Sequence, residues 1–237
     1  MCYIYLWYNI ITRNIKILMK LFLDTADTEA IKEHYDTGII DGVTTNPTLI
    51  RKSGRDPEEV YQELIDYGIP DISMEVVGDY DNMYMEGIHL SKKFGKAATI
   101  KVPCTPDGLK VCKRLSSGLV NVNVTLIFSA AQAILAAKAG AKYVSPFVGR
   151  VDDNSFDGLD LIEQISDIYT IQSIRKTEIL SASIRDVKSV SNSFASGAEV
   201  VTMPPSIFEK MYNHVLTDKG LYQFDMDWAQ VKVGFTT

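Results

Sequence analysis

The stretch Ala97-Ala98-Thr99-Ile100-Lys101-Val102-Pro103, at residues 97–103, is apolar and rich in β-branched residues. It predicts a strand that is buried on both faces, as in a parallel sheet. Burial disfavours the charged form of a lysine, so Lys101 would supply a neutral amine that can form a Schiff base with a carbonyl substrate. Two plainer interpretations stay open: the side chain reaches solvent at the strand end, or it pairs with a carboxylate.

On both sides of this run, short apolar segments alternate with longer segments of helical period. Prolines at 57, 106 and 205 stand where helices should begin, and glycines at 38, 68, 95, 140 and 197 where helices should end. The predicted strands are residues 20–26, 42–46, 71–77, 98–103, 120–127, 143–149, 178–184 and 199–204, and the predicted helices are residues 28–35, 57–67, 82–93, 107–115, 130–138, 156–171, 187–195 and 206–214.

Short buried strands that alternate with helices imply parallel pairing with right-handed crossovers. Eight such units favour an α/β fold of the (β/α)₈ TIM-barrel type over an open, doubly wound sheet. The chain contains neither GxGxxG nor GxxxxGK[ST], which disfavours the nucleotide-binding folds. Residues 222–232, with Phe224 and Trp228, predict an added C-terminal helix that either caps the barrel or reaches a neighbouring subunit.

Residues 1–18 differ from the rest of the chain, because they are apolar and aromatic and include two basic residues, Arg13 and Lys16. The apolar part is too short to span a bilayer, and it lacks the features of a secretory signal. Met19 begins the first clean strand, so an upstream start-site artefact is one explanation of this extension. We expect a single barrel domain with a C-terminal helix over residues 19–237.

The composition excludes several classes of protein. A net charge of −6 without any basic run argues against binding to nucleic acid. The cysteines, Cys2, Cys104 and Cys112, are odd in number and lack metal-ligand spacing, which indicates a reducing compartment and therefore a cytoplasmic protein. The three histidines at 34, 89 and 214 lie far apart in the sequence, so a metal site built on histidine is not expected.

Seven of the eight predicted strands contribute a polar residue near their C-terminal end, and in a TIM barrel these ends form the site. Singly, each has a plainer interpretation: Asp24 could cap a helix, Asn46 could shape the Asn-Pro turn, and Ser183 could fill space. Together they predict one site, because a buried polar group left unpaired costs about 1–3 kcal/mol. The candidates are Asp24, Asn46, Glu75, Lys101, Asn123, Thr125, Ser145, Ser183 and Arg185, with Arg150 just after the sixth strand.

These residue types suit Schiff-base chemistry on a phosphorylated sugar. Lys101 supplies the amine, while Asp24 and Glu75 are available for general acid–base catalysis. Arg150 and Arg185, with Ser183, offer donors for a terminal phosphate. The neutral donors and acceptors for sugar hydroxyls are Asn46, Asn123, Thr125 and Ser145.

Five segments together resemble the transaldolases, in particular the short single-domain transaldolase and fructose-6-phosphate aldolase group. The resemblance covers essentially residues 19–228. The segments are Leu23-Asp24-Thr25-Ala26, Gly42-Val43-Thr44-Thr45-Asn46-Pro47-Thr48, Ile100-Lys101-Val102-Pro103, Asn123-Val124-Thr125-Leu126-Ile127-Phe128-Ser129 and Ser145-Pro146-Phe147-Val148-Gly149-Arg150.

The resemblance implies a class I aldolase-type barrel that needs no metal and no other cofactor. Lys101 would form the Schiff base with the dihydroxyacetone part of a ketose phosphate, and Asp24 would act in C–C cleavage. Glu75, with Thr125 nearby, would position and activate the water of the Schiff-base steps. Asn46 and Asn123 would hold the dihydroxyacetone unit, and the phosphate would bind to Arg150, Ser183 and Arg185.

Glu75 and Phe147 indicate which activity of the family to expect, because the aldolase branch carries glutamine and tyrosine at these positions. A tyrosine hydroxyl can orient a water that protonates the enamine, whereas a phenyl ring cannot. The expected function is therefore transfer of dihydroxyacetone between sugar phosphates in the pentose phosphate pathway. Phe147 could instead simply pack, which fits transfer equally well.

Alternative functions stay open. One is a fructose-6-phosphate aldolase that releases free dihydroxyacetone, and another is a non-catalytic sugar-phosphate-binding protein. A metal-dependent barrel hydrolase is disfavoured because the chain has only three histidines, which lie far apart in the sequence. The expected partners are sugar phosphates, with no nucleic acid and no membrane. The resemblance also implies a ring-based homo-oligomer, commonly a decamer.

Overall fold

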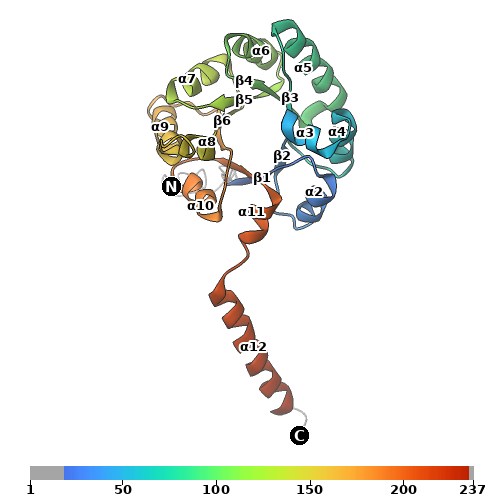
Figure 1. Ribbon diagram of the computed structural model, residues 1–237, viewed down its shortest axis with the longest axis vertical. Coiled ribbons are helices and arrows are strands. Elements are labelled where there is room, and N and C mark those ends of the chain that lie inside the picture. The colour runs from blue at the N-terminus through green and yellow to red at the C-terminus, as the bar shows by residue number, and fades with distance from the viewer. Residues whose placement is uncertain (1–18, 235–237) are drawn as a thin grey trace, which may run out of the picture.

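The computed structural model describes residues 19–234, and its centre is a closed barrel of eight parallel strands (Figure 1). Each strand pairs with the next along the chain, and β8 pairs with β1 to close the barrel. The predicted TIM barrel is confirmed. The strands are β1 (Lys20–Asp24), β2 (Gly42–Thr44), β3 (Ile72–Glu75), β4 (Ala98–Pro103), β5 (Asn121–Ile127), β6 (Tyr143–Pro146), β7 (Glu178–Ser181) and β8 (Val200–Met203).

All eight predicted helices are present around the barrel. The structure adds three short elements that were not predicted: α3 (Pro47–Ser53), the 3₁₀ turn η1 (Gly95–Ala97) and α8 (Val148–Asp152). The predicted helices are observed as α2 (Thr28–Tyr35), α4 (Pro57–Asp66), α5 (Tyr80–Phe94), α6 (Pro106–Ser117), α7 (Ala130–Ala139), α9 (Gly158–Ile171), α10 (Val187–Ala195) and α11 (Pro205–Lys210).

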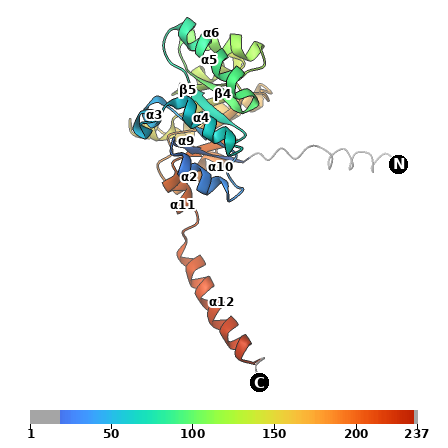
Figure 2. The ribbon, with the colours of Figure 1, turned by 90° about the vertical axis from the view of Figure 1, so that its right-hand side faces the viewer.

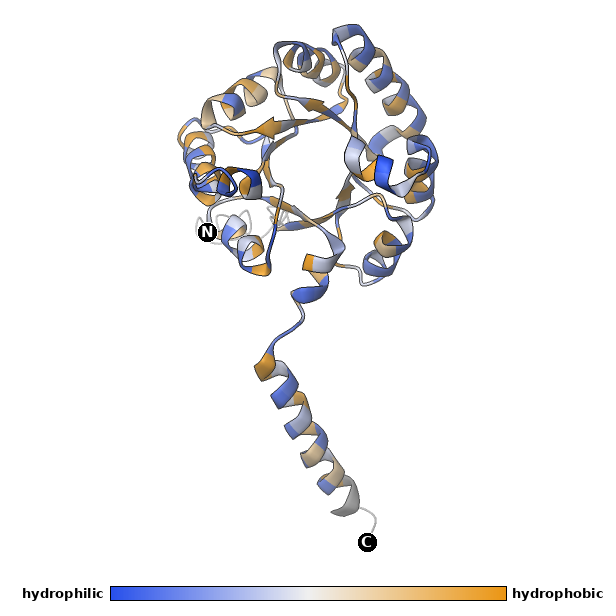
Figure 3. Ribbon diagram, in the orientation of Figure 1, coloured by the Kyte–Doolittle hydropathy of each residue, from blue (hydrophilic) through white to orange (hydrophobic). Residues whose placement is uncertain are grey.

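Apolar side chains form two layers, one between the sheet and the helices and one inside the barrel. The inner layer consists of Phe22, Tyr143, Leu180, Ala182 and Val200, with Phe147 packed against it. Since successive residues of a strand point to opposite faces, the residues two positions after Phe22 and Tyr143 also face the interior. This alternation directs Asp24 and Ser145 inward, above the apolar layer. Figure 3 shows the apolar character of the strands.

The N-terminal ends of the strands are closed by a buried polar network centred on Asp71. Its carboxylate accepts hydrogen bonds from the Thr99 hydroxyl at 2.7 Å and the Tyr143 hydroxyl at 2.8 Å, and it pairs with Lys142 at 2.7 Å. Burial and the neighbouring Asp71 raise the pKa of the Tyr143 hydroxyl, which therefore remains a donor. Because the polar groups at the N-terminal end pair with one another, we expect the reaction to take place at the C-terminal end of the barrel.

The predicted C-terminal helix is observed as α12 (Val215–Gly234), longer than expected. It projects away from the barrel, so it does not cap its own barrel (Figures 1 and 2). No helix within residues 19–234 combines the length and the apolar character that crossing a membrane requires. The extension predicted at residues 1–18 lies outside the described residues.

Gly42 in β2 is required by the inner layer, and replacing it tests that packing. A Cβ atom there would lie 2.6 Å from the Phe22 ring and 2.6 Å from the Asp71 carbonyl oxygen. We expect Gly42→Ala to lower the free energy of unfolding by about 1–3 kcal/mol through overpacking, measured by urea denaturation. Gly118→Ala is the control, because its nearest neighbour lies 3.4 Å away, and it should change stability by at most about 0.5 kcal/mol. Equal effects of the two substitutions would contradict the packing account.

Candidate active site

A central cavity of about 100 Å³ opens at the C-terminal ends of the strands. Its lining includes residues from β1, β2, β4, β6 and the segment after β7, which explains why residues far apart in the sequence meet there. Seven of the predicted site residues line it: Asp24, Asn46, Lys101, Ser145, Phe147, Arg150 and Ser183. Glu75, Asn123, Thr125 and Arg185 do not line this cavity.

Lys101 is buried inside the barrel, with only 5% of its side chain exposed. Its Nζ lies 3.0 Å from Glu75 Oε2 and donates to the Thr45 carbonyl oxygen at 3.0 Å. Glu75 reaches it because the two residues are register partners on β3 and β4. The interpretation of a lysine that reaches solvent is therefore wrong, whereas the pairing with a carboxylate is observed.

This pairing changes what burial alone suggested. The pair places a carboxylate, which can accept a proton, directly beside the amine. The nucleophile must lose a proton before it attacks a carbonyl group. Glu75 is close enough to receive that proton directly.

Asp24, at the end of β1, is not a helix cap. Asp27 caps α2 instead, through a hydrogen bond from the Ala30 amide at 3.2 Å. Asp24 accepts a hydrogen bond from the Thr44 hydroxyl at 2.8 Å. Burial raises the pKa of Asp24, although Lys101 and the Thr44 hydrogen bond oppose the shift. A carboxyl group with a raised pKa is suited to hold and return a proton.

Thr44 and Thr202 were not predicted as site residues. Both line the central cavity, and their hydroxyl oxygens lie 2.7 Å apart. Since Thr44 has one hydroxyl proton and gives it to Asp24, Thr202 donates to Thr44. A signal was present in the sequence, because Thr44 stands two residues before Asn46 and so faces the same side of the extended chain.

Two asparagines play different parts. The amide group of fully buried Asn123 donates to Ser73 Oγ at 3.1 Å and accepts from Ser145 Oγ at 2.7 Å, so Asn123 orients Ser145 from behind the cavity. Asn46 accepts from the Leu49 amide at 3.0 Å and thereby caps α3. The plain interpretation of Asn46 as a local structural residue is thus observed, yet its amide NH₂ group is left to donate to a ligand.

Thr125 has a buried hydroxyl with no hydrogen-bond partner among the described residues. A buried, unpaired hydroxyl is uncommon and calls for a water or a ligand. The next residue, Leu126, has a φ of 59°, and the register between β5 and β6 shifts there. Such a bulge is a frequent device for directing a side chain toward a site.

The two predicted phosphate-binding arginines are not equivalent. Arg150 lines the central cavity, with its guanidinium 4.8 Å from the centre of the Phe147 ring. Arg185 does not line the cavity, and it pairs with Asp153 at 2.7 Å in an exposed position. The backbone nevertheless holds the segments that carry Arg150 and Arg185 close together, because the Gly149 amide donates to the Ser183 carbonyl oxygen at 3.1 Å. A Cβ at Gly149 would lie 2.8 Å from the Arg185 side chain.

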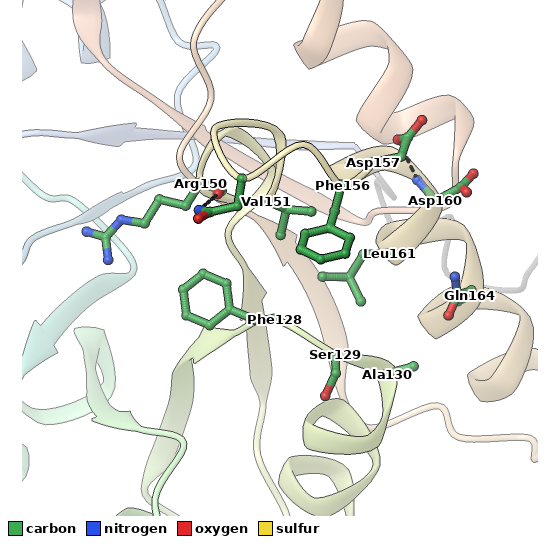
Figure 4. Close-up of a pocket in the computed structure, with 11 residues that line it drawn as sticks. Phe128, Ser129, Ala130, Arg150, Val151, Phe156, Asp157, Asp160, Leu161 and Gln164 are labelled. Carbon is green, nitrogen blue, oxygen red and sulfur yellow. Dashed lines mark hydrogen bonds between the residues drawn. The ribbon is translucent and has the colours of Figure 1, made fainter.

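A second, larger cavity of about 580 Å³ adjoins this region, with Phe128, Phe156 and Leu161 among its lining residues (Figure 4). It shares Arg150 with the central cavity. The Phe128 ring packs edge-on against Phe147 at 5.8 Å between centroids. Phe147 therefore has a packing role, as the plain interpretation expected, in addition to its place in the cavity.

Comparison with known proteins decides among the possible families for this barrel. The family model described as Transaldolase/Fructose-6-phosphate aldolase matches residues 21–233. The chain belongs to this family. The predicted resemblance is therefore confirmed, across the strands that carry the central cavity.

Similar proteins are described as probable transaldolases. One from Paracoccus denitrificans (strain Pd 1222) is 55% identical over 213 residues, which are 90% of this chain and 97% of that protein. One from Nitrosopumilus maritimus (strain SCM1) is 50% identical over 215 residues, or 90% of this chain and 96% of that protein. One from Caulobacter vibrioides (strain NA1000 / CB15N) is 50% identical over 212 residues, or 89% and 97%.

The raised pKa of Asp24 predicts a specific dependence of stability on pH. The folded state holds the Asp24 proton more tightly than the unfolded state, so this residue lowers stability as the pH rises from its unfolded pKa through its folded pKa. We expect Asp24→Asn to be more stable than the parent at pH 7, with a smaller difference in acid, by urea denaturation at several pH values. A variant that is less stable at pH 7 would contradict this account of Asp24.

Proposed function

We propose that this chain is a transaldolase, which moves a dihydroxyacetone unit from a ketose phosphate to an aldose phosphate by way of a Schiff base on Lys101. The reaction would convert sedoheptulose 7-phosphate and glyceraldehyde 3-phosphate into erythrose 4-phosphate and fructose 6-phosphate, in the pentose phosphate pathway. The observation that carries the proposal is the buried Lys101 amine, 3.0 Å from Glu75 in a site that also holds Asp24. Family membership and the names of the relatives support it.

The first step joins Lys101 to the ketose. Glu75 takes a proton from the ammonium group, and the neutral amine attacks the C2 carbonyl carbon to give a carbinolamine. One proton moves from the carbinolamine nitrogen to the C2 oxygen, and Glu75 returns its own proton to the same oxygen. The oxygen then leaves as water while the nitrogen lone pair forms the C=N bond. The buried hydroxyl of Thr125 is available to hold that water.

The second step breaks the C3–C4 bond. Asp24 removes the proton from the C4 hydroxyl, the C3–C4 electrons move toward the iminium nitrogen, and the aldose leaves with a new carbonyl group. An enamine remains on Lys101. Attack of the enamine on an acceptor aldose, with Asp24 returning its proton to the new hydroxyl, reverses the sequence. The raised pKa of Asp24 suits this alternation between base and acid.

Substrate binding is assigned to the remaining polar residues. Asn46, Asn123 and Ser145 would hold the hydroxyls of the dihydroxyacetone unit, with Asn123 acting largely through Ser145. Arg150 and Ser183, at the cavity edge, would bind the phosphate. Arg185 would join them after exchanging its exposed partner Asp153 for the phosphate, at little cost because exposed ion pairs are weak.

The acceptor dependence of the reaction tests the proposed function. Purified protein with fructose 6-phosphate should yield glyceraldehyde 3-phosphate steadily only when erythrose 4-phosphate is present, measured with coupled enzymes. Steady release of free dihydroxyacetone without an acceptor would instead establish the fructose-6-phosphate aldolase. Binding of the sugar without turnover under either condition would favour the non-catalytic sugar-phosphate-binding protein.

Phe147 predicts how the two activities can be exchanged. Phe147→Tyr places a hydroxyl beside the enamine, where it can orient a protonating water, so we expect release of free dihydroxyacetone to rise by about tenfold. The matched control is Phe128→Tyr, because Phe128 packs against Phe147 but does not line the central cavity. Equal release by both variants and the parent would contradict the role given to Phe147.

We also propose that the chain forms a homo-oligomer through α12. Apolar side chains along this helix are exposed, including Trp228 at 60% and Phe224 at 70%. A helix of this kind gains most of its stability from packing, and it has no such packing on its own barrel (Figure 2).

The free thiols of Cys104 and Cys112 support a cytoplasmic location.

Removing α12 tests the oligomer directly. A chain that ends at Asn213 should sediment as a smaller species than the full chain, because the helix that joins neighbouring copies is missing. Circular dichroism serves as the control for folding of the barrel. A full-length chain that sediments as a monomer, or a shortened chain of unchanged oligomeric state, would contradict this proposal.

A further inference from the structure

Glu75 separates two cavities. On one side it contacts Lys101, which lines the central cavity of about 100 Å³. On the other it lines a side cavity of about 310 Å³ between α3, α4 and α5, whose lining includes Asn46, Ile50, Glu75, Val77 and Glu86. Lys101 does not line the side cavity, and Glu75 does not line the central one. Asn46 lines both cavities, and the Glu75 carboxyl group joins the Lys101 amine to the side cavity.

The Schiff-base step produces one molecule that must leave the site. An ammonium group and a ketone give an iminium ion and one water, with no net gain or loss of protons, because both protons of the water come from the nitrogen, one of them by way of Glu75. In the reverse direction one water must enter. That water forms beside the Lys101 nitrogen, and hence beside Glu75.

The central cavity is poorly suited to the release and entry of this water. It is the smaller of the two, and the ketose would occupy it while the carbinolamine loses water. The side cavity is about three times larger and carries polar groups, among them Glu86 and Arg51, that can hydrogen-bond to water. Burial and neighbouring Glu58 raise the pKa of Glu86, while Glu58 itself pairs with His89 and Lys93.

We propose that the side cavity is the water channel of the Schiff-base step, through which water leaves and reaches the Lys101 adduct past Glu75 while the sugar fills the central cavity. This inference rests on the proposed Schiff base at Lys101. It assigns Ile50 and Val77 to the path of the water, although neither lines the central cavity. It also explains why Glu75 contacts Lys101 on one side and lines the side cavity on the other.

Oxygen exchange measures the movement of water to and from the Lys101 adduct separately from C–C cleavage. Each cycle of Schiff-base formation and hydrolysis replaces the C2 oxygen of fructose 6-phosphate with solvent oxygen, which mass spectrometry detects in H₂¹⁸O. We expect Val77→Trp and Ile50→Trp, which fill the side cavity from different walls, each to slow the enzyme-dependent exchange by about tenfold. The matched control is Met85→Trp, at an exposed residue of α5 that lines neither cavity, and it should exchange at the parent rate.

Sugar binding provides the second readout. Val77→Trp and Ile50→Trp, each combined with Lys101→Met, should bind fructose 6-phosphate as tightly as Lys101→Met alone, because the central cavity is intact. Exchange within twofold of the parent in both tryptophan variants would overturn the channel, and so would a loss of exchange fully explained by weaker binding. If the parent protein exchanges no oxygen above the enzyme-free rate, the proposed Schiff base is refuted, and the water channel is refuted with it.

Discussion

The contact between Lys101 and Glu75 is the interaction on which the site depends. Two opposite charges lie 3.0 Å apart inside the barrel, with little exposure to solvent. Each group stabilises the other there, because leaving one member of a buried pair without its partner typically costs about 3–5 kcal/mol. The pair thus allows an amine to be stored out of water, with the group that accepts its proton already in contact.

The barrel supplies this contact through its register. Parallel pairing makes Glu75 and Lys101 neighbours on β3 and β4, and Lys101 and Asn123 neighbours on β4 and β5. The alternation of side chains across each strand then brings all three to the interior. The lower interior is filled by the Phe22 layer and the Asp71 network, so the polar groups meet only at the C-terminal end. The site is therefore a consequence of strand register more than of any loop.

Much of this could be predicted from the sequence, because strand and helix periods differ and because polar residues recur at strand ends. Five predicted strands ran two or three residues past their observed ends, because apolar residues such as Val76 and Val148 continue beyond the paired part of the strand. Asn46 caps α3 and Phe147 precedes α8, two short helices that follow their strands after one or two residues. The Asn-Pro pair at 46–47 was a usable signal for α3, whereas α8 has no capping side chain.

Other features depend on contacts between residues that are far apart in the sequence. Pairing of Lys101 with Glu75 depends on the register between two strands, which periodicity does not specify. The position of Arg185 depends on Asp153, which lies 32 residues away in sequence and carries no motif. The hydroxyl relay from Thr202 through Thr44 to Asp24 joins the last strand to the first two, and only closure of the barrel brings them together.

Trapping the covalent intermediate tests the central claim most directly. Borohydride added to the protein with fructose 6-phosphate should reduce the Schiff base and leave a stable adduct on Lys101, with Lys101→Arg as the unreactive control. Because trypsin no longer cleaves after a modified lysine, the adduct should appear on a peptide of residues 97–110. An adduct on another lysine, such as Lys138 or Lys142, or no adduct on an active protein, would contradict the account.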